Sequence, residues 1–222
     1  MTAFQGSPSG FRHSLIRTAL WLVAVCFLAI PMLGPAPATA ASKAKDAGDP
    51  PTQVYFIRGF LGIFSTGFDS MAKDLARDKI RAEVYGHLSG SSVRAKIVRQ
   101  YAQSKKRRPI VLVGHSFGGN AVLEVAANLR KDNIPVALVI TVDPTRAGPL
   151  SDNVKKYVNY YFSANRLGSK LRPRSGVPQS RITNIDMRKR ADVTGAGDDH
   201  WTVTHNAAIQ AEIMKAVKRA AR

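Results

Sequence analysis

Residues 110–119, Ile-Val-Leu-Val-Gly-His-Ser-Phe-Gly-Gly, determine the fold of this chain. The first four are apolar on both faces of an extended backbone, which is typical of a central strand in a parallel sheet. Gly114 and Gly118 then flank Ser116 in the pattern G-x-S-x-G, and a segment of helical length follows. Because side chains two residues on either side of such a tight turn would collide, only glycine fits there. We therefore predict that Ser116 is a nucleophile held between the elbow glycines Gly114 and Gly118.

Outward from this turn, apolar runs of strand length alternate with segments of helical periodicity. The predicted strands are residues 54–57, 82–87, 110–113, 136–142, 157–162 and 181–186. The predicted helices are residues 67–78, a segment capped by Ser92, residues 119–129, and a C-terminal helix with Ile209, Ile213 and Val217 on one face. Strands with intervening helices predict an α/β fold: a single doubly wound domain with a mostly parallel sheet of about six strands. Such sheets place their chemistry at the carboxyl ends of the strands.

The first 40 residues have the composition of a targeting segment. Arg12 and Arg17 precede an apolar run from Ala19 to Leu33, and Ala38-Thr39-Ala40 offers a small-x-small site. This order is typical of a secretory signal peptide, and the run is shorter than the roughly 20 residues that span a bilayer. We expect export to the periplasm or the medium after cleavage near Ala40, with an uncleaved membrane anchor as the alternative.

The remaining chain has the composition of one folded domain. Residues 41–52 are small, polar and proline-rich, which predicts a flexible lead-in to a domain over 53–222. The chain of 222 residues has 45% hydrophobic residues, which excludes a disordered or fibrous protein. Its only cysteine is Cys26, so cleavage would leave a mature domain without disulfides.

The chain resembles the α/β-hydrolase superfamily, and within it the small lipase-like and cutinase-like serine esterases. The resemblance lies in the elbow, in Arg58-Gly59-Phe60-Leu61-Gly62 after the first strand, and in Asp199-His200-Trp201-Thr202-Val203 near the end. It implies cleavage of carboxylic esters or thioesters through an acyl-serine intermediate. The short interval between Asp143 and Tyr157, where a cap domain would be inserted, leaves no room for one.

A general base for Ser116 has to be a histidine that follows the acid in the order Ser, Asp, His. His87 precedes the serine, and His115 occupies the x position of the elbow, where a packing role is expected. His200 lies in a loop before the last helix, where the family carries its catalytic histidine. His205 is the alternative, in the predicted first turn of that helix.

The candidates for the triad acid are narrowed by a stretch of sequence that has no carboxylate. No Asp or Glu lies between Asp152 and Asp186, so the loop after the predicted strand 157–162 cannot supply a carboxylate. Asp143 follows the preceding strand directly and is our predicted triad acid, with Asp186 in reserve. The oxyanion hole is expected to use the backbone N–H of Phe117. By resemblance to the lipase H-G-x-x-G segment, the second donor is the N–H of Phe60, although Arg58 stands where that segment has histidine.

The formal net charge of +18 is the one abnormal property of the composition. It suggests docking on an anionic membrane or envelope surface in addition to an acyl substrate. Nucleic-acid binding is not expected, because no aromatic-interleaved basic motif is present. No cofactor or metal is expected. Acyl transfer on the same triad, or a basic envelope-binding protein that has lost activity on a hydrolase scaffold, remain as alternatives, and the sequence leaves the oligomeric state open.

Overall fold

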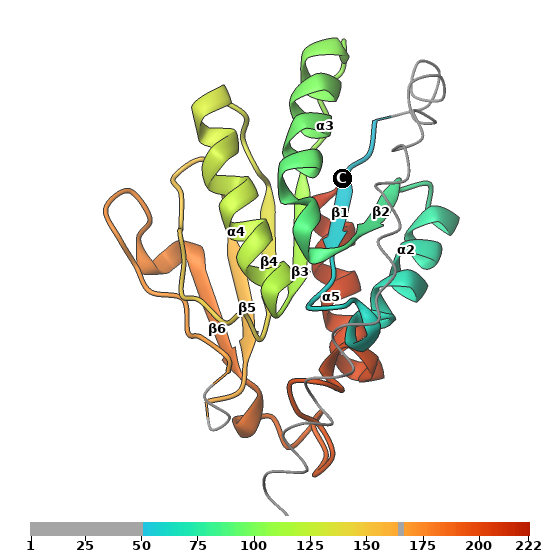
Figure 1. The fold of residues 1–222 in the computed structure, drawn as a ribbon, viewed down its shortest axis with the longest axis vertical. Helices are drawn as coiled ribbons and strands as arrows, with labels where there is room; N and C mark the ends of the chain where they lie inside the picture. Colours follow the sequence, from blue (N-terminus) through green and yellow to red (C-terminus); the bar gives the residue numbers. More distant parts are fainter. Residues whose placement is uncertain (1–50, 164–166) are drawn as a thin grey trace, which may run out of the picture. The chain divides into compact units, whose positions relative to one another are not determined.

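The computed structural model describes residues 51–163 and 167–222, and six parallel strands form its sheet in the order β2-β1-β3-β4-β5-β6 (Figure 1). The strands are β1 (Val54–Ile57), β2 (Ala82–Tyr85), β3 (Val111–His115), β4 (Leu138–Val142), β5 (Tyr157–Tyr161) and β6 (Ile182–Asp186). Helices connect successive strands in the first half of the chain. The predicted doubly wound α/β domain is therefore confirmed.

Two layers of helices cover the sheet (Figure 1). The helices α2 (Gly67–Arg77) and α5 (Ala207–Ala220) pack on one face, and α3 (Gly90–Gln103) and α4 (Phe117–Leu129) pack on the other. In β1, Val54 and Phe56 contribute to the core under α2 and α5, while Tyr55 and Ile57 contribute to the core under α3 and α4. Alternation along a strand buried on both faces thus supplies both cores at once.

The order in which the chain adds strands to the sheet reverses at β1, so the carboxyl ends of β1 and β3 flank a topological switch point. From β1 the chain adds β2 on one side, and β3 then pairs with the other side of β1, with Val54 opposite Val111. In open α/β sheets the crevice at such a switch point is where ligands bind. Ser116 follows β3 directly, so the fold itself places the elbow at this crevice.

Several element boundaries differ from the sequence-based prediction. Helix α3 begins at Gly90 instead of after Ser92, because the 3₁₀ turn His87–Ser89 runs straight into it. His205 belongs to a 3₁₀ turn, Val203–His205, and not to the first turn of α5. Asn206 caps α5 instead: its side chain accepts the N–H of Ile209.

The connection from β4 to β5, residues 143–156, is described throughout and contains no helix, so the domain lacks a cap at this point. The predicted signal peptide over residues 1–40 and most of the lead-in over 41–52 lie outside the described residues. Within residues 51–163 and 167–222, no helix is both long and apolar enough to cross a membrane.

Candidate active site

Ser116 occupies a strained turn between β3 and α4. Its backbone has φ 54° and ψ −122°, in the left-handed half of conformational space that non-glycine residues rarely adopt. A Cβ on Gly114 would lie 2.2 Å from the carbonyl oxygen of Gly118, and a Cβ on Gly118 would lie 2.1 Å from that of Ile57. Gly114 therefore lets the turn close, and Gly118 lets the turn pack against the end of β1. This is the geometry of a nucleophile elbow.

The structure brings His200 and Asp143 to the serine from distant parts of the chain. Nε2 of His200 lies 2.9 Å from Oγ of Ser116, and Nδ1 lies 2.7 Å from Oδ2 of Asp143. The exposed fractions are 4% for Ser116, 3% for His200 and 0% for Asp143. Since the carboxylate can only accept, Nδ1 carries a proton and Nε2 is free to accept the serine O–H. The geometry is that of a Ser-His-Asp triad.

Asp143 is held in place from several directions. It follows β4 with φ 47°, its own N–H donates to the Tyr160 carbonyl at 2.7 Å, and its Oδ1 accepts the Phe162 N–H at 2.9 Å. Gly168 packs directly on the carboxylate, so that a Cβ there would lie 1.7 Å from Oδ1. The loop after β5 therefore supplies the walls of the acid site, although it has no carboxylate of its own.

The reserve candidates lie elsewhere and have other roles. Asp186 caps the 3₁₀ turn after β6, where its Oδ1 accepts the N–H of Arg188 at 3.1 Å. His205 is exposed, and its Nε2 lies 3.4 Å from the Thr66 hydroxyl. The structure pairs neither of these side chains with Ser116.

The loop that carries His200 is shaped by two carboxylates. Oδ1 of Asp199 accepts the N–H of Trp201 at 2.8 Å and that of Thr202 at 3.1 Å. Oδ2 of Asp198 accepts the Gly195 N–H at 2.8 Å. The bonds to Asp199 form a local Asx turn, whereas Asp198 accepts an N–H from three residues earlier in the chain. The run Asp-Asp-His-x-Thr could have indicated the Asx turn from the sequence.

The loop after β1 lies against the elbow, as the oxyanion prediction requires. A Cβ on Gly59 would lie 3.1 Å from Cβ of Ser116, and the Phe60 ring lies 6.1 Å from the Phe117 ring. The Phe117 N–H is the first of α4 and so has no acceptor within the helix. Arg58, in the position of the lipase histidine, forms an ion pair with Asp69 of α2. Participation of the Phe60 and Phe117 amides in an oxyanion hole stays a prediction.

His115 was expected to be a packing residue, and that expectation is incomplete. It is 1% exposed and its two ring nitrogens each have a partner, Oγ of Ser65 at 2.8 Å and the carbonyl oxygen of His200 at 2.8 Å. Burial, assisted by the neighbouring His200, lowers the pKa of His115 to about 4. The ring is therefore neutral at neutral pH.

Exposed apolar side chains gather around the site. The large hydrophobic residues that are exposed in the described part of the chain are Phe60, Leu61, Ile63, Phe64, Leu88, Phe117, Leu167 and Trp201. All lie in segments that follow the carboxyl ends of β1, β2, β3, β5 and β6. Phe60, His87 and Phe117 contact one another beside the serine, and Phe64 packs on Trp201 beside His200. We call the eight exposed hydrophobic residues, without His87, the apolar rim.

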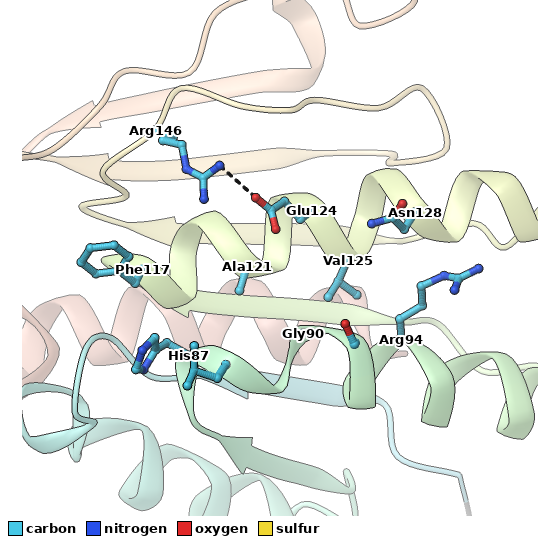
Figure 2. Close-up of a pocket in the computed structure, with 11 residues that line it drawn as sticks. His87, Gly90, Arg94, Phe117, Ala121, Glu124, Val125, Asn128 and Arg146 are labelled. Atoms are coloured by element: carbon cyan, nitrogen blue, oxygen red, sulfur yellow. Dashed lines mark ion pairs between the residues drawn. The ribbon is translucent and has the colours of Figure 1, made fainter.

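A groove of about 470 Å³ extends from the rim between α3 and α4 (Figure 2). Phe117 and His87 lie at the end near the serine, Ala121 and Val125 line the middle, and Arg94 lies toward the far end. Arg94 is held by Asp132, with Nη2 2.8 Å from Oδ2. Arg146 and Glu124 form a second ion pair along the groove, at 3.0 Å (Figure 2). The groove therefore combines apolar residues in its middle with charged side chains beside them and at its distal end.

Comparisons with known proteins agree with this architecture. The sequence profile of the alpha/beta hydrolase family matches residues 57–217. A parallel sheet with an elbow serine at the switch point defines an α/β-hydrolase fold, and the chain belongs to the alpha/beta hydrolase family. The protein is thus a hydrolase of the alpha/beta superfamily. No curated protein sequence matches the chain.

Solved structures similar to the chain are distant in sequence. A Xanthomonas campestris pv. campestris protein, named as a hydrolase of the alpha/beta superfamily, has 17% identity and a TM-score of 0.41, covering 76% of this chain and 99% of its own. A YdeN-like hydrolase of Pectobacterium atrosepticum has 12% identity and a TM-score of 0.44, covering 77% and 93%. A Lactobacillus plantarum protein, named as a cell surface hydrolase, has 10% identity and a TM-score of 0.43, covering 77% and 92%.

Proposed function

We propose that this protein is a serine hydrolase that cleaves carboxylic esters or thioesters through an acyl-serine intermediate. The observation that carries the proposal is the continuous hydrogen-bonded series from Asp143 through His200 to Ser116, at 2.7 and 2.9 Å. In such a series the carboxylate fixes the tautomer of the histidine, and the histidine can take the serine proton as the hydroxyl attacks.

The reaction follows from these positions. Oγ of Ser116 attacks the ester carbonyl carbon while Nε2 of His200 takes the hydroxyl proton, and Asp143 stabilises the imidazolium. The oxyanion accepts the N–H groups of Phe117 and Phe60. His200 then returns its proton to the leaving alcohol or thiol as the bond to the acyl carbon breaks. A water molecule, deprotonated by His200, then attacks the carbonyl carbon of the acyl-serine. The bond from that carbon to Oγ of Ser116 breaks, His200 returns the proton to Oγ, and the carboxylic acid leaves.

The apolar rim supports a substrate with an apolar acyl group. Exposed apolar surface at the mouth of a site is favourable only when something apolar covers it. The groove beside Phe117 could take the part of the substrate farther from the ester, with Arg94 near its distal end. This arrangement suits an elongated ester more than a small, deeply enclosed one.

A fluorophosphonate probe tests the proposed function without knowledge of the substrate. We expect intact-mass analysis to find one covalent adduct on the wild-type protein and none on Ser116→Ala, because only a serine with an activated hydroxyl reacts. Absence of an adduct on the folded wild-type protein would contradict the proposal. Adding a second alcohol during turnover then separates hydrolysis from acyl transfer, since transfer yields a new ester in place of the free acid.

We propose that the protein acts after export, with cleavage near Ala40. The basis is the basic, apolar and small-x-small order of residues 1–40. N-terminal sequencing of protein recovered outside the cytoplasm tests this: a start at Ala41 is expected, and a start at Met1 or Thr2 would favour the anchored alternative.

We further propose that an anionic membrane is a partner, bound through the amino edge of the sheet. Lys105–Arg108 precede β3, Lys155 and Lys156 precede β5, and Arg181 precedes β6, so these cations collect at the edge opposite Ser116. A hollow of about 590 Å³ there is lined by residues that include Arg107, Arg108, Lys155 and Arg181. Near a membrane surface each cation contributes about 1 kcal/mol.

Sedimentation with vesicles tests this partner. Binding to vesicles that contain phosphatidylglycerol is expected to weaken with salt and to fall at least tenfold when Lys105, Lys106, Arg107 and Arg108 are all changed to Gln. Hydrolysis of a soluble ester should be unchanged in that variant, because the edge lies opposite the serine. Equal binding to neutral vesicles, or an unchanged affinity in the variant, would contradict this proposal. Strong binding by a protein that gives no probe adduct would instead favour the non-catalytic alternative.

A further inference from the structure

His115 occupies the x position of the elbow, a position that the triad mechanism does not use. Its ring nevertheless lies between two catalytic segments, 5.0 Å from the His200 ring between centroids. Its hydrogen bonds join the loop after β1 to the loop that carries the general base. These loops are separated by more than half of the chain, so tertiary contacts hold them together, among them those of His115 and the packing of Phe64 on Trp201.

The partners of His115 fix which atom carries its proton. A carbonyl oxygen can only accept, so Nε2 of His115 donates to the backbone oxygen of His200 at 2.8 Å. The neutral ring then has an acceptor at Nδ1, and the Ser65 hydroxyl donates to it at 2.8 Å. Oγ of Ser65 in turn accepts the N–H of Gly59 at 3.0 Å. Each donor in this buried series therefore has an acceptor, and each acceptor has a donor.

The hydrogen bonds from His115 through Ser65 to Gly59 constrain the loop Arg58–Gly62 after β1, which we call the oxyanion loop. Because the Gly59 N–H is bonded to Ser65, it is not available to a substrate, and Phe60 is the next residue along the loop. Gly59 also lies against Ser116, with only 3.1 Å between an ideal Cβ at 59 and Cβ of the serine. Any shift of Ser65 would therefore move the predicted oxyanion donor relative to the nucleophile.

We propose that His115, acting with Ser65, is a positioning residue that fixes the general-base loop and the oxyanion loop relative to Ser116. This inference rests on the proposed function. His115 does not touch the reacting atoms; it sets the position of His200 through the backbone and that of Phe60 through Ser65 and Gly59. A displacement of about 1 Å in such a site can lower the rate by about 100-fold.

The neutral state of His115 is part of this role. His200 becomes an imidazolium in the transition state, and a second cation 5.0 Å away would raise its energy. A buried ring whose Nε2–H bonds a carbonyl and whose Nδ1 accepts a hydroxyl stays neutral while His200 is charged.

Two conservative variants separate the two hydrogen bonds. In His115→Gln the side-chain NH₂ can take the place of Nε2 and keep the donor to His200, while the bond to Ser65 is lost. In His115→Asn the amide oxygen can take the place of Nδ1 and keep the acceptor for Ser65, while the donor to His200 is lost. Ser65→Ala removes the hydroxyl that donates to Nδ1 of His115 and accepts the N–H of Gly59.

We expect kcat for a soluble ester to fall about 10- to 100-fold in each variant, with KM changed less than about threefold, since the transition state depends on these positions more than ground-state binding does. Rates are taken per site titrated with the fluorophosphonate, so that loss of folded protein does not enter. In the Ser65→Ala background, His115→Gln should cost at most about twofold more, because both changes remove the same link. His205→Gln, an exposed histidine outside the series, is the matched control and should leave kcat unchanged.

The outcomes are distinct. A wild-type protein that gives no probe adduct would overturn the proposed function, and this inference with it. A reactive wild-type protein with kcat per titrated site within twofold in His115→Gln, His115→Asn and Ser65→Ala would overturn the inference alone. Additive losses for Ser65→Ala and His115→Gln would also overturn it, because additivity means that the two residues do not act through one shared hydrogen bond.

Discussion

Asp143→Asn is expected to lower kcat for an ester substrate by about 10⁴-fold, with little change in KM. The Asn side chain fits the same space, but its NH₂ group can donate where the carboxylate only accepted. His200 would then present an unprotonated Nδ1 to residue 143 and direct its Nε2–H at Ser116, where it could no longer accept the serine proton. Steady-state kinetics on the purified variant, normalised to folded protein, would measure the loss.

Asp186→Asn is the matched control for this experiment. Asp186 is the last residue of β6, at the same edge of the sheet as Asp143 after β4, yet it caps a surface turn by accepting the Arg188 N–H at 3.1 Å. An Asn side chain can keep that bond through its carbonyl oxygen, so kcat should stay within about twofold. A large loss in Asp186→Asn together with an active Asp143→Asn would show that the acid had been assigned to the wrong residue.

Gly168→Ala is expected to lower kcat by about 100-fold, because it displaces the Asp143 carboxylate although residue 168 has no catalytic group. The new Cβ would lie 1.7 Å from Oδ1 and 2.7 Å from Cγ of Asp143, well inside contact distance. Either the carboxylate rotates away from His200 or the loop after β5 moves outward, and both weaken the 2.7 Å contact with Nδ1. Overpacking of this kind costs about 1–3 kcal/mol of folding free energy, so the domain should stay folded.

Gly86→Ala is the corresponding control, because a Cβ at Gly86 meets no atom within 4 Å and its φ of −75° suits any residue. Kinetics and thermal unfolding of the two variants would be compared directly. If Gly168→Ala retained full activity, the loop after β5 could not have the close contact with Asp143 that the structure describes.

The elbow shows how much a local pattern can determine. Gly114 and Gly118 were predicted from steric need alone, and the structure gives each ideal Cβ a contact near 2 Å with backbone atoms. The strand before Ser116 and the helix after it also follow from local apolar periodicity. The contact at Gly114 is with Gly118, a neighbour in the chain, so that need for glycine can be predicted without knowledge of the fold. The contact at Gly118 is with Ile57 of β1, so the physical reason for that glycine depends on the tertiary structure.

The prediction of His200 and Asp143 as partners of the serine required information beyond the sequence around each residue. Placing His200 and Asp143 at the carboxyl ends of strands relied on the general rule for parallel sheets, together with a resemblance to known hydrolases. The structure pairs His200 with Ser116 and Asp143 with His200, and it leaves His205 and Asp186 outside this series. The choice between similar residues could not come from spacing, because the length of a loop does not give the direction in which its side chains point.

By itself the sequence determined the doubly wound α/β domain, the elbow and the position of its serine, because these follow from periodicity, glycine sterics and strand order. Only the tertiary structure decided that Gly168 packs on the Asp143 carboxylate and that His115 joins the loop after β1 to the loop that carries His200. The physical reason is that these contacts join segments 25 to 85 residues apart. Packing distances and hydrogen-bond partners at that range exist only after the sheet has brought its strand ends together.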